Sequence, residues 1–216
     1  VKPLLRFSDK QGIYLMRGGE ENLKFETVNL KEVEVTVEEV FQNNMLFFFN
    51  NNYNYDRYRY DNSYGDEEPS EYSVGDYGKE IYTEEIRFAE NKNTFQYATI
   101  NLHKAINQRF RGIYVVSVRS DEDYYVRDAK IISFSDIGLI AKKSGNDLLV
   151  FANSIKTTQA LPNVTVQIVS ANNQTLSTVT TDAQGIAKVE NLYKEPMDFS
   201  PRLLYASLGD DFNYLD

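Results

Sequence analysis

Few residues of this chain have side chains suited to catalysis or metal binding, and they are scattered. His103 is the only histidine, and the 216 residues contain no cysteine. A lone histidine cannot form a zinc site or a catalytic triad without partners. The lack of cysteine removes disulfides, thiolate ligands and cysteine nucleophiles. We therefore interpret His103 as a surface or edge-of-core residue.

Carboxylates are plentiful, with 32 Asp and Glu residues. Two clusters, Asp66-Glu67-Glu68 with Glu71 and Asp121-Glu122-Asp123, could offer oxygen ligands to calcium. Calcium loops space their ligands around a tight turn that contains glycine. Neither cluster has that spacing, so a solvated loop is favoured over a calcium site. Because no phosphate loop, nucleophile elbow or metal-ligand motif is recognisable, the sequence predicts no enzyme activity, no metal and no cofactor.

One segment is rich in tyrosine, which is common in binding surfaces. Half of the sixteen tyrosines fall within Asn50–Tyr82, and two arginines interleave with them. The candidate binding residues are Tyr53, Tyr55, Arg57, Tyr58, Arg59, Tyr60 and Tyr64. A hairpin extension or partial disorder is the alternative, and it is favoured because the segment has almost no aliphatic residues and cannot build a core.

The charge and hydropathy of the chain exclude two classes of partner. The net charge is −9 and neither half has a basic patch, so nucleic acid is not an expected partner. No apolar run reaches about 18 residues, and a membrane span is therefore not expected within this chain. The chain has no signal peptide and both its ends are abrupt, so we expect it to be a piece of a longer protein.

The apolar residues alternate with polar ones in short segments. Val33, Val35 and Val37 interleave with Glu and Thr, which is the period of a strand with one buried face. Similar segments follow at Glu80–Phe88, Thr94–Leu102, Gly112–Arg119, Tyr125–Phe134, Asp147–Asn153, Val164–Ser170, Thr175–Thr181, Ile186–Val189 and Arg202–Leu208. Many short strands at this spacing predict an all-β fold of antiparallel β-sandwiches. One helical turn is predicted at Leu102–Arg109, where Leu102 and Ile106 share a face.

The length fits two domains of about 100 residues each. We predict one sandwich over residues 1–134, with the Tyr- and Asn-rich insertion at about 50–82, and a second over 135–216, truncated at its C-terminus. The second contains a hairpin whose turn is Thr181-Asp182-Ala183-Gln184-Gly185. There Gly185 can take a positive φ and Asp182 can accept backbone N–H bonds.

Several short motifs follow one another in a fixed order. In the second half they are Phe134–Leu139, Leu149–Ser154, Leu161–Val164, Thr181–Gly185 and Leu204–Asp211. In the first half they are Tyr14–Gly19, Phe25–Leu30, Val33–Val37 and Gly112–Val118. This order resembles the N-terminal macroglobulin-like domains of bacterial alpha-2-macroglobulins, a family in which a domain opens with a Ser-Asp-x-Gly-Leu motif and closes with a Gly-Asp-Asp motif. The resemblance excludes Asn50–Tyr82.

The resemblance implies a non-catalytic scaffold in an inhibitor that traps endoproteases by collapsing after a bait segment is cut. Expected partners are neighbouring macroglobulin domains of the same parent chain and, through the full-length protein, endoproteases. The expected location is the bacterial periplasm or cell envelope, with a secreted or lipid-anchored parent. No functional residue of the family maps onto this chain. The alternative is an envelope adhesin, or a glycan- or protein-binding module, that uses the tyrosine-rich segment.

Overall fold

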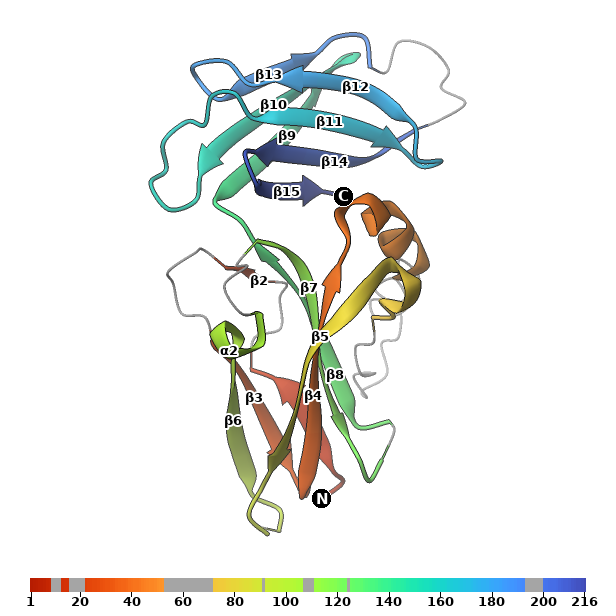
Figure 1. Cartoon of the computed structure of the whole chain (residues 1–216), viewed down its shortest axis with the longest axis vertical. Helices are drawn as coiled ribbons and strands as arrows, with labels where there is room; N and C mark the ends of the chain where they lie inside the picture. Colours follow the sequence, from red (N-terminus) through yellow and green to blue (C-terminus); the bar gives the residue numbers. More distant parts are fainter. Residues whose placement is uncertain are drawn as a thin grey trace. The chain divides into compact units, whose positions relative to one another are not determined.

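The structure is a computed structural model of the chain. It describes residues 1–8, 13–15, 22–52, 72–90, 92–106, 111–123, 125–192 and 200–216, and for 13–15 the backbone alone. The chain divides into two compact units, Val1–Ser133 and Phe134–Asp216, called here the N-terminal and C-terminal units (Figure 1). Almost all regular structure is antiparallel β-strand, so the prediction of an all-β fold is confirmed.

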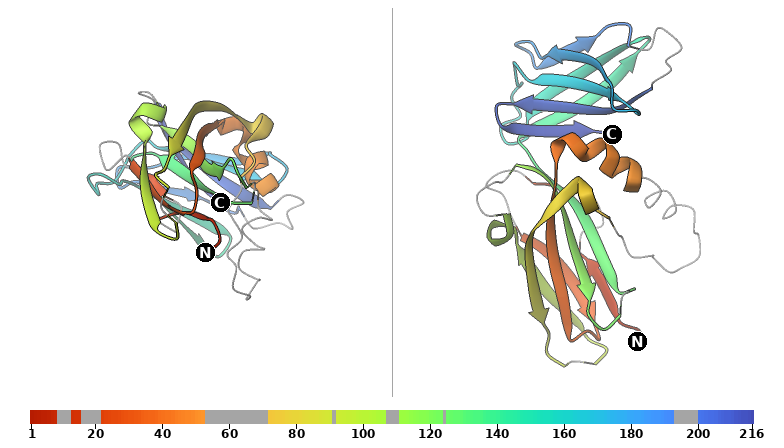
Figure 2. Two further views of the ribbon diagram at one scale, coloured as in Figure 1. Left: turned by 90° about the horizontal axis from the view of Figure 1, so that it is seen from below. Right: turned by 45° about the vertical axis from the view of Figure 1, so that its right-hand side comes forward.

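The N-terminal unit contains two sheets. The smaller has the order β1 (Leu4–Phe7), β3 (Asn22–Val28), β6 (Phe95–Asn101). The larger has the order β2 (Ile13–Leu15), β8 (Arg127–Phe134), β7 (Gly112–Ser120), β4 (Glu32–Val40), β5 (Gly78–Arg87). Two short 3-10 helices are present: η1 (Gln42–Asn44) precedes the tyrosine-rich segment 50–82, and η2 (Gly75–Tyr77) lies near its C-terminal end. Figure 2 shows these strands from two further directions.

Alternation explains which face of β4 is buried. Val33, Val35 and Val37 have no exposed surface, whereas the residues between them are half-buried, as the sequence predicts. A strand places successive side chains on opposite faces, so these valines point into one core. The smaller sheet contributes the ring of Phe25, which packs edge-to-face against Phe7 at 6.3 Å between centroids.

Residues 45–52 are helical. Met45, Leu46 and Phe48 are at most 1 % exposed, so this helix supplies core side chains next to the end of β4. Near the C-terminal end of the tyrosine-rich segment, Val74 is 1 % exposed and β5 already begins at Gly78. Ordered structure therefore extends further into 50–82 than its composition indicates.

A short helix, α2 (Leu102–Ile106), follows β6 directly. Leu102 and Ile106 are both buried, at 0 % and 4 % exposed, which confirms the predicted shared face. The rest of the predicted turn, 107–109, lies outside the described residues.

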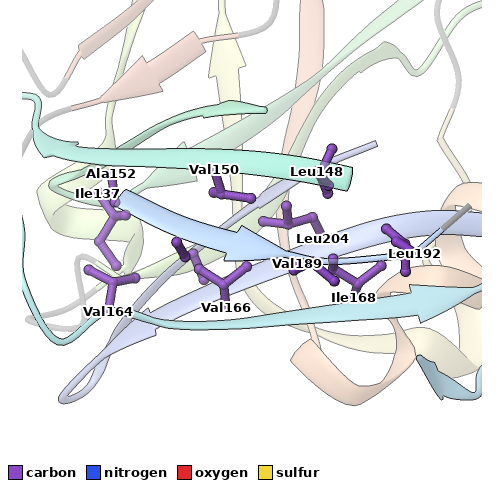
Figure 3. Close-up of a cluster of buried hydrophobic side chains, with 12 residues drawn as sticks. Ile137, Leu148, Val150, Ala152, Val164, Val166, Ile168, Val189, Leu192 and Leu204 are labelled. Atoms are coloured by element: carbon purple, nitrogen blue, oxygen red, sulfur yellow. The ribbon is translucent and has the colours of Figure 1, made fainter. Parts of the chain in front are cut away.

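The C-terminal unit is a sandwich of two sheets. One has the order β13 (Ile186–Val189), β10 (Asp147–Ser154), β9 (Ile137–Ser144). The other has the order β12 (Thr175–Thr180), β11 (Thr165–Ser170), β14 (Pro201–Leu208), β15 (Asp211–Leu215). Figure 3 shows the core between them, where Val150 of β10 and Val166 of β11 are fully buried.

Candidate functional site

The seven candidate binding residues of the tyrosine-rich segment lie outside the described residues, as do Asp66, Glu67, Glu68 and Glu71. The structure does describe the two ends of this segment. The buried side chain of Asn52 donates hydrogen bonds to the carbonyls of Phe48 (2.8 Å) and Ser73 (3.2 Å). Its Oδ1 accepts one from the N–H of Ser73 (2.9 Å). One side chain thus joins two described parts of the chain that lie on either side of residues 53–71.

The second acidic cluster forms a turn between β7 and β8. Asp121, Glu122 and Asp123 are all exposed, and the hydroxyl of Ser120 accepts the N–H of Glu122 at 3.2 Å. Asp123 in turn accepts the N–H of Tyr125 at 3.0 Å through Oδ1. Within the described residues, no group of three or more His, Cys, Asp or Glu side chains could hold a metal ion.

His103 lies exposed on α2, beside a residue with a strongly perturbed pKa. Lys104 Nζ lies 2.7 Å from Glu84 Oε1, and the Tyr82 hydroxyl donates to Glu84 Oε2 at 2.5 Å. The hydrogen bond from Lys104 lowers the pKa of Glu84, and the same bond raises the pKa of Lys104. Both shifts stabilise the charged forms, so neither group is poised to transfer a proton near neutral pH. The trio therefore ties α2 to β5.

Two carboxylates of the larger sheet in the N-terminal unit lie opposite each other, and one of them, Glu80, accepts a hydrogen bond of 2.8 Å from the Thr83 hydroxyl. Glu38 of β4 and Glu80 of β5 are directly opposite in the register. Burial, and then the charge of Glu80, raise the pKa of Glu38. Like charges opposite one another on a sheet are destabilising.

A polar network of the C-terminal unit surrounds Asp136, just before β9. Its carboxylate accepts the hydroxyl of Ser154 (2.8 and 3.0 Å) and the N–H of Lys156 (2.8 Å). The Ser154 hydroxyl accepts the N–H of Thr157 at 2.9 Å, and the N–H of Ile155 donates to the Asp136 carbonyl at 2.8 Å. Asp136 therefore organises the turn that follows β10.

Strand β15 completes this network from the opposite sheet. Asp211 Oδ2 accepts the N–H of Asp136 at 2.9 Å, and the buried Asn213 donates Nδ2–H to the carbonyl of Ile137 at 2.7 Å. We call Asp136, Ser154, Asp211 and Asn213 the Asp136 clamp. Its side chains satisfy backbone groups at the start of β9, which otherwise would lack partners on that side. Both carboxylate oxygens of Asp136 accept hydrogen bonds, whereas Asp211 accepts through Oδ2 and its buried Oδ1 has no partner among the described residues.

The predicted turn at 181–185 is confirmed, but it closes no hairpin, because β12 and β13 lie in different sheets and β13 pairs with β10. Gly185 has φ +71°, and Asp182 Oδ1 accepts the N–H groups of Gln184 (2.9 Å) and Ile186 (3.0 Å). A Cβ on Gly185 would lie 2.3 Å from the carbonyl oxygen of Ala152. Glycine is therefore required here for φ and for space.

Sequence reasoning did not assign roles to the clamp. Asp136 and Asp211 belong to the two motifs that carry the family resemblance, but they are 75 residues apart. Each of these aspartates lies at or next to the end of a strand, within a Ser-Asp or Gly-Asp-Asp motif. Because aspartate side chains at such positions commonly accept hydrogen bonds from backbone N–H groups, the motifs could have indicated this role.

The comparisons with known proteins agree with the family resemblance that the order of the sequence motifs indicates. Residues 134–216 match the family model described as the bacterial alpha-2-macroglobulin MG3 domain. Alpha-2-macroglobulin of Escherichia coli (strain K12) is 28 % identical over 112 residues, which are 51 % of this chain and 7 % of that protein. The chain thus spans a small part of the length of this curated relative.

Solved structures cover both units. Native E. coli alpha-2-macroglobulin spanning domains NIE-MG1 has a TM-score of 0.70 at 23 % identity, with 100 % of this chain and 97 % of that one covered. The structure of the same E. coli protein spanning domains MG0-NIE-MG1 has a TM-score of 0.71 at 23 % sequence identity. It is matched over 100 % of this chain and 64 % of that chain. The Salmonella alpha-2-macroglobulin mutant Y1175G has a TM-score of 0.64 at 21 % sequence identity. It is matched over 100 % of this chain and 12 % of that chain. At these identities the structures establish the shared fold. The chain therefore resembles the bacterial alpha-2-macroglobulins, and its residues 134–216 match the model of their MG3 domain.

Proposed function

We propose that this chain is a non-catalytic scaffold segment of a bacterial alpha-2-macroglobulin-like protease inhibitor. The observation that carries the proposal is the family match over 134–216, which coincides with the C-terminal unit. The fold similarity of both units to an E. coli alpha-2-macroglobulin fragment supports it. We assign the parent protein to the bacterial periplasm or cell envelope.

The proposed mechanism belongs to the whole parent protein. An endoprotease cuts a bait segment outside this chain, and the macroglobulin domains then collapse around the protease as rigid bodies. A domain that moves as one body must keep its internal hydrogen bonds. The Asp136 clamp supports this role because it joins the two sheets of the C-terminal unit through buried or half-buried side chains.

Among the described residues, no helix is long and apolar enough to span a bilayer. The partners that we propose within the parent are the adjacent macroglobulin domains. Endoproteases are proposed as partners of the full-length protein.

The test uses the parent protein and a panel of endoproteases. A single cut is expected to produce a faster-migrating, compact form on native gels, and the retained protease is expected to keep activity on small substrates alone. Cleavage without compaction for every protease would overturn the proposal. Parent protein with Asp211→Ala is expected to be cut at the same rate but to retain less protease. Asp182→Asn is the control because it alters an exposed turn outside the clamp.

A further inference from the structure

The first and last strands of the C-terminal unit are joined through side chains. Strands β9 and β15 belong to different sheets, so in the described part of the chain no ladder of backbone hydrogen bonds pairs them. Two bonds of the Asp136 clamp make the connection. Asp136 donates its N–H to Asp211 Oδ2 at 2.9 Å, and Asn213 donates Nδ2–H to the carbonyl of Ile137 at 2.7 Å.

These two bonds connect the beginnings of both strands. Strand β9 begins at Ile137, directly after Asp136. Strand β15 begins at Asp211, and Asn213 is its third residue. From the clamp the two strands run in the same general direction (Figure 1). A force that separates the start of β9 from the end of β15 therefore slides one strand along the other.

The direction of such a force decides how much of it the clamp can resist. Sliding the strands stretches both hydrogen bonds at the same time, so that both must break together. Peeling the strands apart from their far ends would reach the clamp last and break bonds one after another. Because unfolding under force is governed by the unfolding rate, a barrier that acts in one direction raises the force needed in that direction.

Burial and further hydrogen bonds strengthen the clamp. Asn213 and Ser154 are each 3 % exposed, so water has little access to replace their bonds. The Asp136 carboxylate accepts the N–H of Lys156, and the Asp136 carbonyl accepts the N–H of Ile155, both at 2.8 Å. A pull on Asp136 is therefore shared with the turn that follows β10.

We propose that the C-terminal unit carries a pulling force between its two ends, and that the Asp136 clamp is the joint that bears this force. Strand β8 ends at Phe134, two residues before Asp136. Tension that arrives along β8 thus meets the clamp before it meets β9. The inference goes beyond the protease-trap proposal and does not depend on it.

The test is single-molecule force spectroscopy of the full 216-residue chain, held at its two termini. Unfolding of the C-terminal unit, residues 134–216, should lengthen the chain by roughly 30 nm at about 3.6 Å per residue, which separates it from the longer step of the N-terminal unit. Because the chain has no cysteine, Asn146→Cys provides a second handle at the exposed turn between β9 and β10.

The two pulling directions should give different forces. A pull between residue 146 and the C-terminus acts on the far ends of β9 and β15 and peels them apart. The C-terminal unit is expected to resist the pull between the chain termini with about twofold greater force. Equal forces in the two directions would rule the proposal out, and this comparison needs no substitution in the clamp.

Two substitutions separate the clamp from general stability. Asp211→Ala should lower the force between the termini at least about 1.5-fold and leave the peeling force unchanged. Thr181→Ala is the matched control, because the buried Thr181 hydroxyl bonds the backbone of Val164 and Leu161, away from β9 and β15. It should lower the midpoint of urea unfolding but not the force between the termini. Equal losses of force in both variants would contradict the proposal, since force would then follow overall stability.

Discussion

Asp211 Oδ2 accepts a hydrogen bond of 2.9 Å from the backbone N–H of Asp136. Asp211→Ala removes the acceptor and leaves a half-buried N–H unpaired, so we expect a loss of about 1–3 kcal/mol in the free energy of unfolding. Asp211→Asn keeps an acceptor oxygen and should lose less. Urea unfolding of the two variants checks this difference. Equal losses would mean that the hydrogen bond contributes little.

Gly185 and Gly209 form a matched pair for testing close packing in the C-terminal unit. Both have positive φ, +71° and +62°, but a Cβ on Gly209 would meet no atom within 4 Å. Gly209→Ala should cost about 1 kcal/mol from backbone strain. Gly185→Ala should cost about 3 kcal/mol or more, because its Cβ would also collide with the backbone of Ala152. Thermal denaturation measures both, and similar midpoints would contradict the collision.

Asn52 should stabilise the N-terminal unit through its bonds to the backbone of Ser73. Asn52→Ala is expected to destabilise this unit by about 1–3 kcal/mol, since it leaves polar backbone groups at a buried position without partners. The amide of Ser73 should then exchange its hydrogen faster. Asn51→Ala is the control because Asn51 is exposed on the same helix. Unchanged exchange at Ser73 in Asn52→Ala would refute the role.

The opposite pKa shifts of Glu38 and Glu84 predict opposite pH dependences. The pKa of Glu38 is raised in the folded state, so its ionisation opposes folding, and stability is lost as the pH rises through that pKa. Glu38→Gln should therefore stabilise the N-terminal unit near neutral pH, and this gain should vanish in acid. The effect is small because solvent screens a half-exposed carboxylate.

The pKa of Glu84 is lowered, chiefly by its hydrogen bond from Lys104. Its contribution to stability is present above the unfolded pKa and is lost as the pH falls through the folded one. Glu84→Gln should therefore destabilise the unit near neutral pH and have little effect in acid. Unfolding by urea from about pH 3 to about pH 8 measures both variants, and parallel curves would contradict the assignment.

Regular alternation allowed the strands around Val33–Val37 to be predicted, because one face of β4 is buried and the other is not. The same reasoning missed β1, β2, β3 and β15. In β15 the usual polarity is inverted: Asn213 is buried at 3 % exposed, whereas Phe212 and Tyr214 are only partly buried. Asn213 points inward to bond Ile137, and hydropathy alone does not reveal this partner.

The helix at 45–52 was missed for a different reason. Its three phenylalanines are surrounded by asparagines, which have low helix propensity, so packing of Met45, Leu46 and Phe48 decides its conformation. The clamp could not be deduced because its members come from distant parts of the chain. Family resemblance identified the motifs, and the structure supplied the hydrogen bonds between them.

The bonds from Asp211 and Asn213 to β9 join the first and last strands of the C-terminal unit. During synthesis, β9 leaves the ribosome with its partners in β15 still unmade, so the sandwich closes late and its folding depends on contacts of long sequence separation. These bonds also hold the two ends of the C-terminal unit close together in space. A circular permutant with new ends at the exposed turn around Gly145 should therefore keep both sheets and fold in a different order.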